Sequence, residues 1–146
     1  MRRLHLFIHP AGLAMCLGLL PVLSAAQNVP MKIEIPADAI RLEGIPKVRI
    51  DEGETRATRR VLRPAEAAKE RLVVRMRDGE FFWETREDRP LKLNLSGDFT
   101  YLSTDPGHYI RLSRVGDKLT YVEHVEMDSR SVTWRGELTI VLGKKP

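Results

Sequence analysis

The stretch LVVRMRDGEFFWE, residues 72–84, decides the fold class of this chain. Two runs of strand-forming residues flank Asp78-Gly79, a dipeptide suited to a tight type I′ turn, so the sequence predicts a β-hairpin. A two-residue turn also fixes the register of the two strands. We therefore expect two cross-strand pairs on the side that faces the core: Met76 with Phe81, and Val74 with Trp83.

Phe82 points to the opposite side of this hairpin, where it pairs with Arg75. Because an isolated hairpin is only marginally stable, we expect Phe82 to be covered by a helix or by the N-terminal segment. The alternative is an exposed anchor for a partner. The charged turn that follows supplies Arg86 and Arg89, which would extend such an interaction surface or hold an anionic ligand.

The rest of the chain repeats the pattern of short alternating runs separated by turn residues. It predicts a mainly β fold, an antiparallel meander of roughly seven or more strands that forms a small barrel or a sandwich. One short helix is expected near residues 64–70, because Pro64 suits a first helical position and strong helix formers follow it. The turns are Ser96-Gly97-Asp98, Thr104-Asp105-Pro106-Gly107, Gly116-Asp117 and Asp128-Ser129.

Residues 1–26 have the plan of a secretory signal peptide: a basic start, an apolar run and small residues at Ser24-Ala25-Ala26. The alternative is an uncleaved anchor, but Pro21 leaves the apolar run shorter than the roughly 20 residues that a membrane span needs. We expect cleavage near Ala26, an exported protein that is periplasmic or extracellular, and no transmembrane span in the mature chain. The chain's one cysteine, Cys16, would be removed, which excludes a disulfide and thiolate chemistry.

Residues 27–63 are predicted to form an N-terminal arm outside the β domain of residues 64–146. The arm contains short alternating runs interrupted by prolines, and prolines restrict strands to the edge of a sheet. Its last part, TRATRRVLR at residues 55–63, is interpreted as a solvated basic linker. Because it carries no aromatic residues for stacking, no nucleic-acid partner is expected.

Two ionisable residues are predicted to lie on an apolar wall of the sheet. Tight turns at residues 116–117 and 128–129 place His108, Tyr121, Glu123 and Trp134 on one face, with His108 and Glu123 as diagonal neighbours within hydrogen-bonding reach. They form either a satisfied internal pair or the polar floor of a ligand pocket that has Tyr121 and Trp134 as walls. A third alternative makes Glu123 a general base. No nucleophile, metal-ligand or cofactor motif accompanies these residues, so neither a metal nor a cofactor is predicted.

Five short elements between Phe81 and Gly136 resemble a pattern found in uncharacterised exported bacterial proteins. They are FFWETREDRPL, SGDFTY, GHYIRL, YVEH and SVTWRG. The resemblance implies export and a β-rich domain, and it implies no activity. The last element departs from the pattern, because Arg135 separates Trp134 from Gly136.

These observations favour an exported, non-enzymatic binding or adaptor module that contacts an envelope protein. In that case either Phe82 or an unpaired strand at residues 32–35 should be exposed. The alternative is a small β-barrel that binds an apolar or amphipathic ligand. The second alternative is a hydrolase that uses Glu123 and His108.

Overall fold

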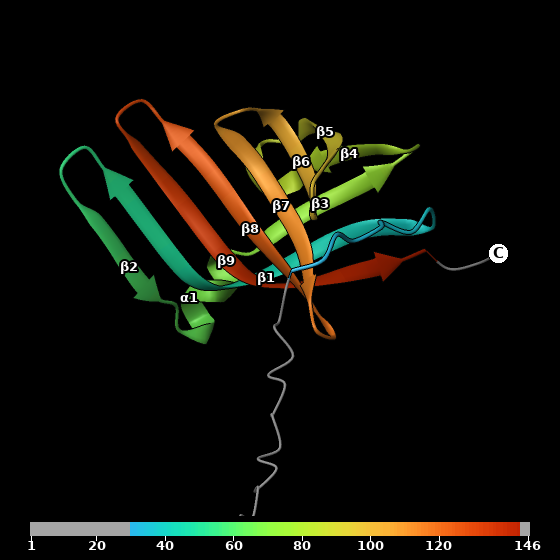
Figure 1. Cartoon of the computed structure of the whole chain (residues 1–146), viewed down its shortest axis with the longest axis horizontal. Helices are drawn as coiled ribbons and strands as arrows, with labels where there is room; N and C mark the ends of the chain where they lie inside the picture. The colour runs from blue at the N-terminus through green and yellow to red at the C-terminus, as the bar shows by residue number, and fades with distance from the viewer. Residues whose placement is uncertain (1–29, 144–146) are drawn as a thin grey trace, which may run out of the picture.

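The computed structural model describes residues 30–143 of the 146-residue chain, so the predicted signal peptide and its cleavage site lie outside the described residues. The described elements follow one another as nine strands and two short helical segments (Figure 1). They are β1 (Ala39–Gly53), β2 (Ala57–Val61), α1 (Pro64–Lys69), β3 (Leu72–Arg77), β4 (Glu80–Trp83), the 3-10 turn η1 (Glu84–Arg86), β5 (Arg89–Ser96), β6 (Phe99–Asp105), β7 (His108–Val115), β8 (Lys118–Met127) and β9 (Arg130–Leu142).

The strands form one antiparallel sheet in the order β2-β1-β3-β4-β5-β6-β7-β8-β9, and β1 also pairs with β9. This last pairing closes β1 and β3–β9 into an eight-stranded barrel, and β2 is the additional strand beside β1. The predicted mainly β fold is therefore confirmed, and the barrel is the form that the meander takes. Seven strands follow α1, as expected.

The turns give the predicted registers. Asp78 and Gly79 both have positive φ, 55° and 80°, as a type I′ turn requires. Across this hairpin Met76 faces Phe81 and Val74 faces Trp83. The registers of β7 with β8 and of β8 with β9 are also as predicted: Ile110 faces Glu123, His108 faces Val125, and Glu123 faces Trp134.

The expectation that prolines keep the N-terminal segment at a sheet edge is wrong. β1 lies inside the sheet, with β9 along one side and β3 and β2 in succession along the other. Pro46 keeps a register partner, Gly136, and stands directly beside a β-bulge, because the register between β1 and β9 shifts between Pro46 and Val48 with Lys47 as the extra residue. The arm is therefore part of the barrel wall rather than a separate segment.

One other local expectation is wrong, and the expected coverage of Phe82 holds with different covering groups. Residues 57–61 of the predicted linker form strand β2, because the end of β1 offers them a pairing edge. Phe82 is half-buried, and it is covered by the guanidinium groups of Arg75 and Arg77, which lie 6.0 and 5.7 Å from its ring centre. The predicted helix is present as α1, and the Glu66 carboxylate accepts the backbone N–H of Arg63 at its start.

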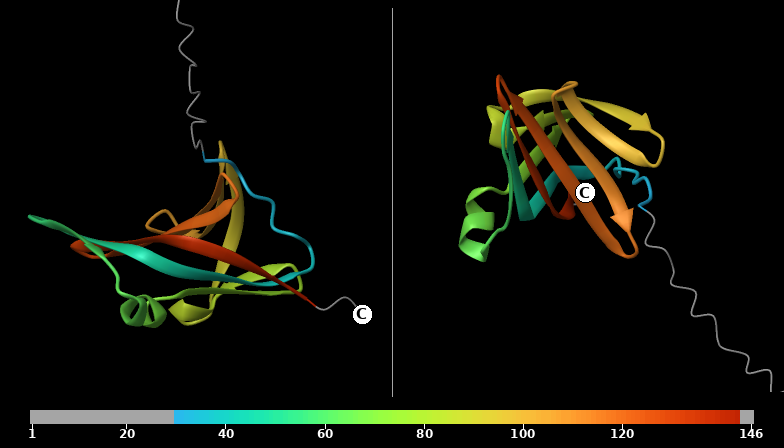
Figure 2. Two further views of the ribbon diagram at one scale, coloured as in Figure 1. Left: turned by 90° about the horizontal axis from the view of Figure 1, so that it is seen from below. Right: turned by 60° about the vertical axis from the view of Figure 1, so that its left-hand side comes forward.

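The segment that precedes β1 closes one end of the barrel (Figure 2). Met31 and Arg114 exchange backbone hydrogen bonds, and the buried Thr100 hydroxyl donates to the Ile33 carbonyl at 2.6 Å. Residues 32–35 form no strand, and the Ile33 side chain is buried with the main core, so the expected unpaired strand is not present there. The main core fills the barrel interior with Leu42, Leu72, Val74, Trp83, Leu91, Leu102, Ile110, Leu112, Tyr121 and Leu138.

We predict that Gly136→Ala destabilises the protein by about 1–3 kcal/mol, the usual range for overpacking. An added Cβ at Gly136 would collide with the carbonyl oxygen of Ile45 and lie 2.8 Å from the Cα of Pro46, both backbone atoms of the paired strand. Urea unfolding measures the effect. Gly53→Ala is the matched control, because its Cβ would meet only the Arg56 carbonyl at 3.7 Å. Equal stabilities of the two variants would contradict this account of the β1–β9 contact.

Candidate functional site

A pocket of about 570 Å³ opens at the end of the barrel opposite the Ile33 segment. Antiparallel connectivity brings the η1 connection, the β6–β7 turn and the β8–β9 turn to this end. The pocket, called the mouth pocket below, is lined by Trp83, Thr85, Arg86, Glu87, Arg89, His108, Val125, Glu126 and Met127. It is within the size range of small-molecule sites.

Arg86 and Glu123 form an ion pair at the floor of the mouth pocket. Arg86 Nη2 lies 2.8 Å from Glu123 Oε1, and the Glu123 side chain is 1% exposed, whereas that of Arg86 is 34% exposed. Glu123 is inward-facing on β8, and η1 turns the chain so that Arg86 reaches it from the pocket side. Arg86 is therefore an interior side chain that remains accessible from the mouth.

The predicted contact between His108 and Glu123 is not formed. His108 Nδ1 instead lies 2.8 Å from Asp105 Oδ1, in the turn directly before β7. Asp105 is three residues away in the chain and its Cα pairs with that of His108, so it is the closer partner. This hydrogen bond with His108 holds the pKa of Asp105 below its usual value.

Several buried polar atoms near this ion pair have no hydrogen-bond partner in the described protein. They are both carboxylate oxygens of Glu123, the Tyr121 hydroxyl, Trp83 Nε1 and Arg86 Nε. The distance between Glu123 and Arg86 is thus short enough for an ion pair, but the contact does not have the geometry of a good hydrogen bond. Because nearly all buried polar groups in proteins are hydrogen-bonded, this cluster is suited to receive polar groups from a bound molecule.

Burial raises the pKa of Glu123 to about 7, and the cation of Arg86 opposes that rise only in part. Burial and the nearby Glu123 carboxylate also raise the pKa of Tyr121. Near neutral pH the Glu123 carboxyl group therefore exists in comparable amounts as acceptor and as hydrogen-bond donor.

Trp134 connects this pair to a second group of charges. Its ring contacts two guanidinium groups, that of Arg86 at 4.7 Å and that of Arg49 at 5.4 Å from the ring centre. Its indole N–H donates to Glu70, which also pairs with Arg49 at 3.1 Å. α1 covers this part of the sheet, since Ala67 packs with Trp134 and Val132 (Figure 2). Trp134 is therefore a buried positioning element for Arg86 rather than a wall of the mouth pocket.

The structure brings together some of the residues predicted for the site and separates others. Tyr121 and Glu123 lie on one inward face with Trp134, and His108 lines the mouth pocket without contacting Glu123. Arg86 and Arg89, predicted as an exposed surface with Phe82, instead line that pocket. Sequence reasoning missed the partnership of Arg86 with Glu123 and the roles of Arg49 and Glu70. The one available signal was that an inward carboxylate on an apolar wall requires a cation, but nothing in the strand periodicity identifies which one.

Within residues 30–143, no group of three or more histidine, cysteine, aspartate or glutamate side chains is placed to hold a metal ion. In the same range no helix has the length and apolarity of a membrane-spanning segment.

No family model, curated protein sequence or solved structure matches this chain. The resemblance of residues 81–136 to exported bacterial proteins therefore stays a prediction, and the functional argument depends on the geometry described above.

We predict that the stability of the protein falls as the pH rises from about 4.5 to about 7, and that Glu123→Gln removes this part of the pH dependence. The folded state holds the Glu123 proton more tightly than the unfolded state does, because the pKa is raised from 4.5 to about 7. The stabilisation is present below the unfolded value and is lost as the pH passes through the folded value. Its size is on the order of 3 kcal/mol.

Urea unfolding of the two proteins at about pH 5 and about pH 8 measures the effect, because this window spans most of the shift. Glu43→Gln is the control, since Glu43 is a partly exposed carboxylate on β1 with a local partner, Arg41. If the unfolding free energies of the wild type and Glu123→Gln change in parallel with pH, Glu123 is not the titrating group.

Proposed function

We propose that the protein is a small non-catalytic binding barrel that takes an amphipathic molecule with an anionic head group into the mouth pocket. The observation that carries this proposal is the buried and incompletely hydrogen-bonded Arg86–Glu123 pair at the pocket floor. A cation that is one-third exposed and faces a pocket is positioned to meet an incoming anion.

The pocket lining supports an amphipathic ligand rather than a purely polar one. Trp83, Val125 and Met127 supply apolar and polarisable surface on its walls. Arg89 adds a second cation at the opening, whereas Glu87 and Glu126 add acidic groups at the same pocket. We place the anionic head on Arg86 at the floor and the apolar body along Val125 and Met127.

Glu123 tolerates the negative head group of a ligand beside it, because its own pKa is raised to about 7 and it can take up a proton. When an anion approaches Arg86, protonation of Glu123 removes the repulsion between the two carboxyl groups and supplies a hydrogen-bond donor. The Tyr121 hydroxyl is a further unpartnered donor in this cluster, and the Trp83 indole N–H lies close enough to Glu123 to oppose part of the rise in its pKa.

The arrangement supports binding more than catalysis. The hydrolase hypothesis requires Glu123 and His108 to act together, but His108 is held by Asp105 and Glu123 by Arg86. We include export in the proposal, on the basis of the signal-like segment at residues 1–26.

Octanoate, a small amphipathic carboxylate, is the probe for this proposal. We expect it to bind in calorimetry, and we expect the double variant Arg86→Gln/Glu123→Gln to bind it at least about tenfold more weakly, because a charge-assisted hydrogen bond is lost. The double variant replaces both ionic groups together, so no unpaired buried charge is left to unfold the barrel.

Arg41→Gln/Glu43→Gln is the matched control, because it removes an ion pair of 3.3 Å on the outside of β1. It should bind octanoate as the wild type does. Absence of octanoate binding to the wild type, or equal affinity of the Arg86 and Glu123 double variant, would overturn the proposal.

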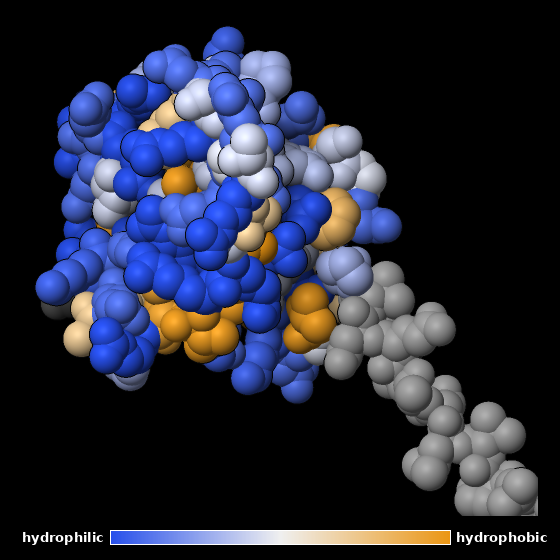
Figure 3. All heavy atoms as spheres, turned by 90° about the vertical axis from the view of Figure 1, so that its left-hand side faces the viewer, coloured by the Kyte–Doolittle hydropathy of each residue, from blue (hydrophilic) through white to orange (hydrophobic). Residues whose placement is uncertain are grey.

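A second function, an adaptor that contacts another protein, is favoured by one observation. β2 ends the strand order, and all five of its residues are exposed, with Val61 at 69%. An unpaired strand edge is a template for β-strand addition by a partner. Figure 3 views the side of the molecule that carries β2 and shows a mostly hydrophilic surface with small apolar areas.

For the adaptor, we predict that a photoreactive group attached at Arg59→Cys crosslinks one defined protein in host cells, whereas the same group at Lys92→Cys on β5 does not. Both positions are exposed strand residues, but only Arg59 lies on β2. Mass spectrometry of the products identifies the partner. Identical products from the two positions would exclude recognition through the β2 edge.

A further inference from the structure

A second pocket lies on the outer face of the barrel, separate from the mouth pocket. It is a shallow groove of about 570 Å³ over β5, β6 and β7, lined by Asn94, Ser96, Tyr101, Ser103, Asp105, Pro106 and Tyr109. Asn94 faces Tyr101 and Ser103 faces Tyr109 across the strands, whereas the neighbouring residues Leu102 and Ile110 point into the core. The groove is therefore built from one face of three adjacent strands.

An aromatic row fixes the geometry of this groove. The rings of Phe99 and Tyr101 meet edge to face at 6.2 Å, and those of Tyr101 and Tyr109 meet edge to face at 6.0 Å. Tyr109 then stacks on His124 at 5.1 Å, and His124 is held by the Thr133 hydroxyl. Because each ring is supported by its neighbour, Tyr101 and Tyr109 offer partly exposed rings in a preset arrangement.

The groove provides neutral hydrogen-bonding groups. Asn94 supplies an amide, Ser96 and Ser103 supply hydroxyls, and the two tyrosines supply phenols. Its one ionisable side chain of low pKa, Asp105, already accepts the backbone N–H of Gly107 at 3.0 Å and pairs with the His108 ring. No lysine or arginine lines the groove.

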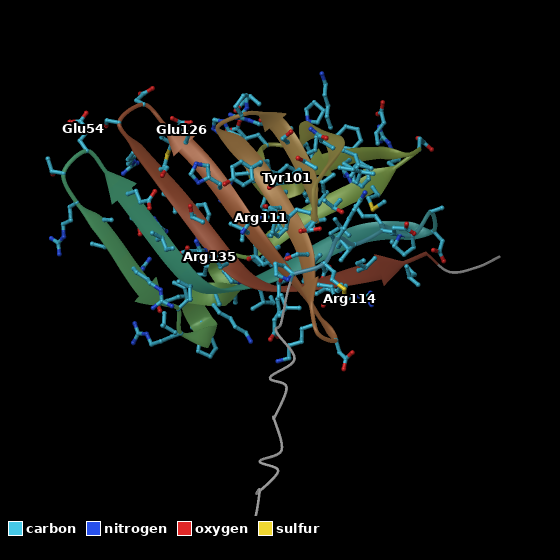
Figure 4. All side chains as sticks on the ribbon, viewed as in Figure 1. Glu54, Tyr101, Arg111, Arg114, Glu126 and Arg135 are labelled. Atoms are coloured by element: carbon cyan, nitrogen blue, oxygen red, sulfur yellow. The ribbon has the colours of Figure 1, made fainter. Side chains whose placement is uncertain are left out.

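Two cations lie near the groove on the same sheet face. Arg111 faces Tyr101, and Lys92 faces Ser103 (Figure 4 labels Tyr101 and Arg111). The guanidinium of Arg111 lies 4.5 Å from the ring centre of Phe99, so it is directed to that ring. A nucleic acid would require several cations along its phosphates, and only these two lie near the groove. An anionic ligand would be repelled by the Asp105 carboxylate.

We propose that this groove binds a neutral saccharide. The negative ring faces of Tyr101 and Tyr109 attract the positively polarised C–H groups of a pyranose ring. The amide of Asn94 and the hydroxyls of Ser96 and Ser103 hydrogen-bond to the sugar hydroxyls and set its orientation. A short oligosaccharide lies across β5–β7, and this binding is independent of the mouth pocket because the two pockets share no residue.

The experiment is calorimetric titration of the protein with chitotriose, cellotriose and maltotriose. We expect at least one of these neutral trisaccharides to bind with a dissociation constant on the order of 1 mM or lower. Tyr101→Ala should weaken this binding by about tenfold or more, because it removes a central ring of the row. Asn94→Ala, an exposed position whose truncation leaves the core intact, should weaken the same binding several-fold.

Two controls separate this proposal from the others. Arg135→Ala removes an exposed side chain on β9 of the same sheet face, further along the row that contains Tyr101 (Figure 4), and should leave saccharide binding unchanged. The double variant Arg86→Gln/Glu123→Gln should also bind the saccharide normally, even if it loses octanoate.

Three results of the saccharide titrations would overturn the proposal. They are no binding of any of the three trisaccharides, binding that survives both Tyr101→Ala and Asn94→Ala, and binding that disappears in the Arg86 and Glu123 double variant. The last result would place the saccharide in the mouth pocket. Binding of a thymidine oligonucleotide that competes with the saccharide would likewise contradict a neutral-ligand groove.

Discussion

The pairing of β1 with β9 is the constraint on which the rest of the structure depends, because it converts a meander into a closed barrel. The two backbones approach so closely at Pro46 and Gly136 that only glycine fits at the latter. The register shift at this point changes which residues of β1 face inward. Beyond the shift, Arg49 faces Trp134 in place of an apolar residue, and closure of the barrel thereby introduces charge beside the inward face.

The charged side chains around Trp134 differ in how completely they are paired and hydrogen-bonded. Arg49 is held by Asp51 and Glu70, and the hydrogen bond with Asp51 raises its pKa, so this group is balanced. Glu123 has one cation at 2.8 Å and no well-formed hydrogen bond. A buried ion pair is generally weak evidence for stability, since apolar residues of the same volume often serve as well. The raised pKa of Glu123 indicates that desolvation outweighs its pairing, so the pair costs stability near neutral pH.

The local part of this structure was predictable from sequence and the non-local part was not. Turns such as Asp78-Gly79 and Gly116-Asp117 fix registers through their own backbone conformation, which is why the inward positions of Trp83, Tyr121 and Glu123 were predicted. The partner of Glu123 was not predicted, because Arg86 lies in a 3-10 turn that has no strand periodicity and meets β8 only after the barrel closes. The same reason applies to β2, whose pairing edge exists only because β1 extends past β3.

The two proposed sites use opposite faces of the same strands, and strand alternation gives them different chemistry. Inward positions on β8 carry Tyr121 and Glu123, whereas the outward position between Glu123 and Val125 carries His124, the end of the aromatic row. One hydrogen bond borders both pockets, since His108 lines the mouth pocket and its partner Asp105 lines the outer groove. This hydrogen bond also holds the pKa of Asp105 below its usual value, so the groove keeps a carboxylate that disfavours an anion there.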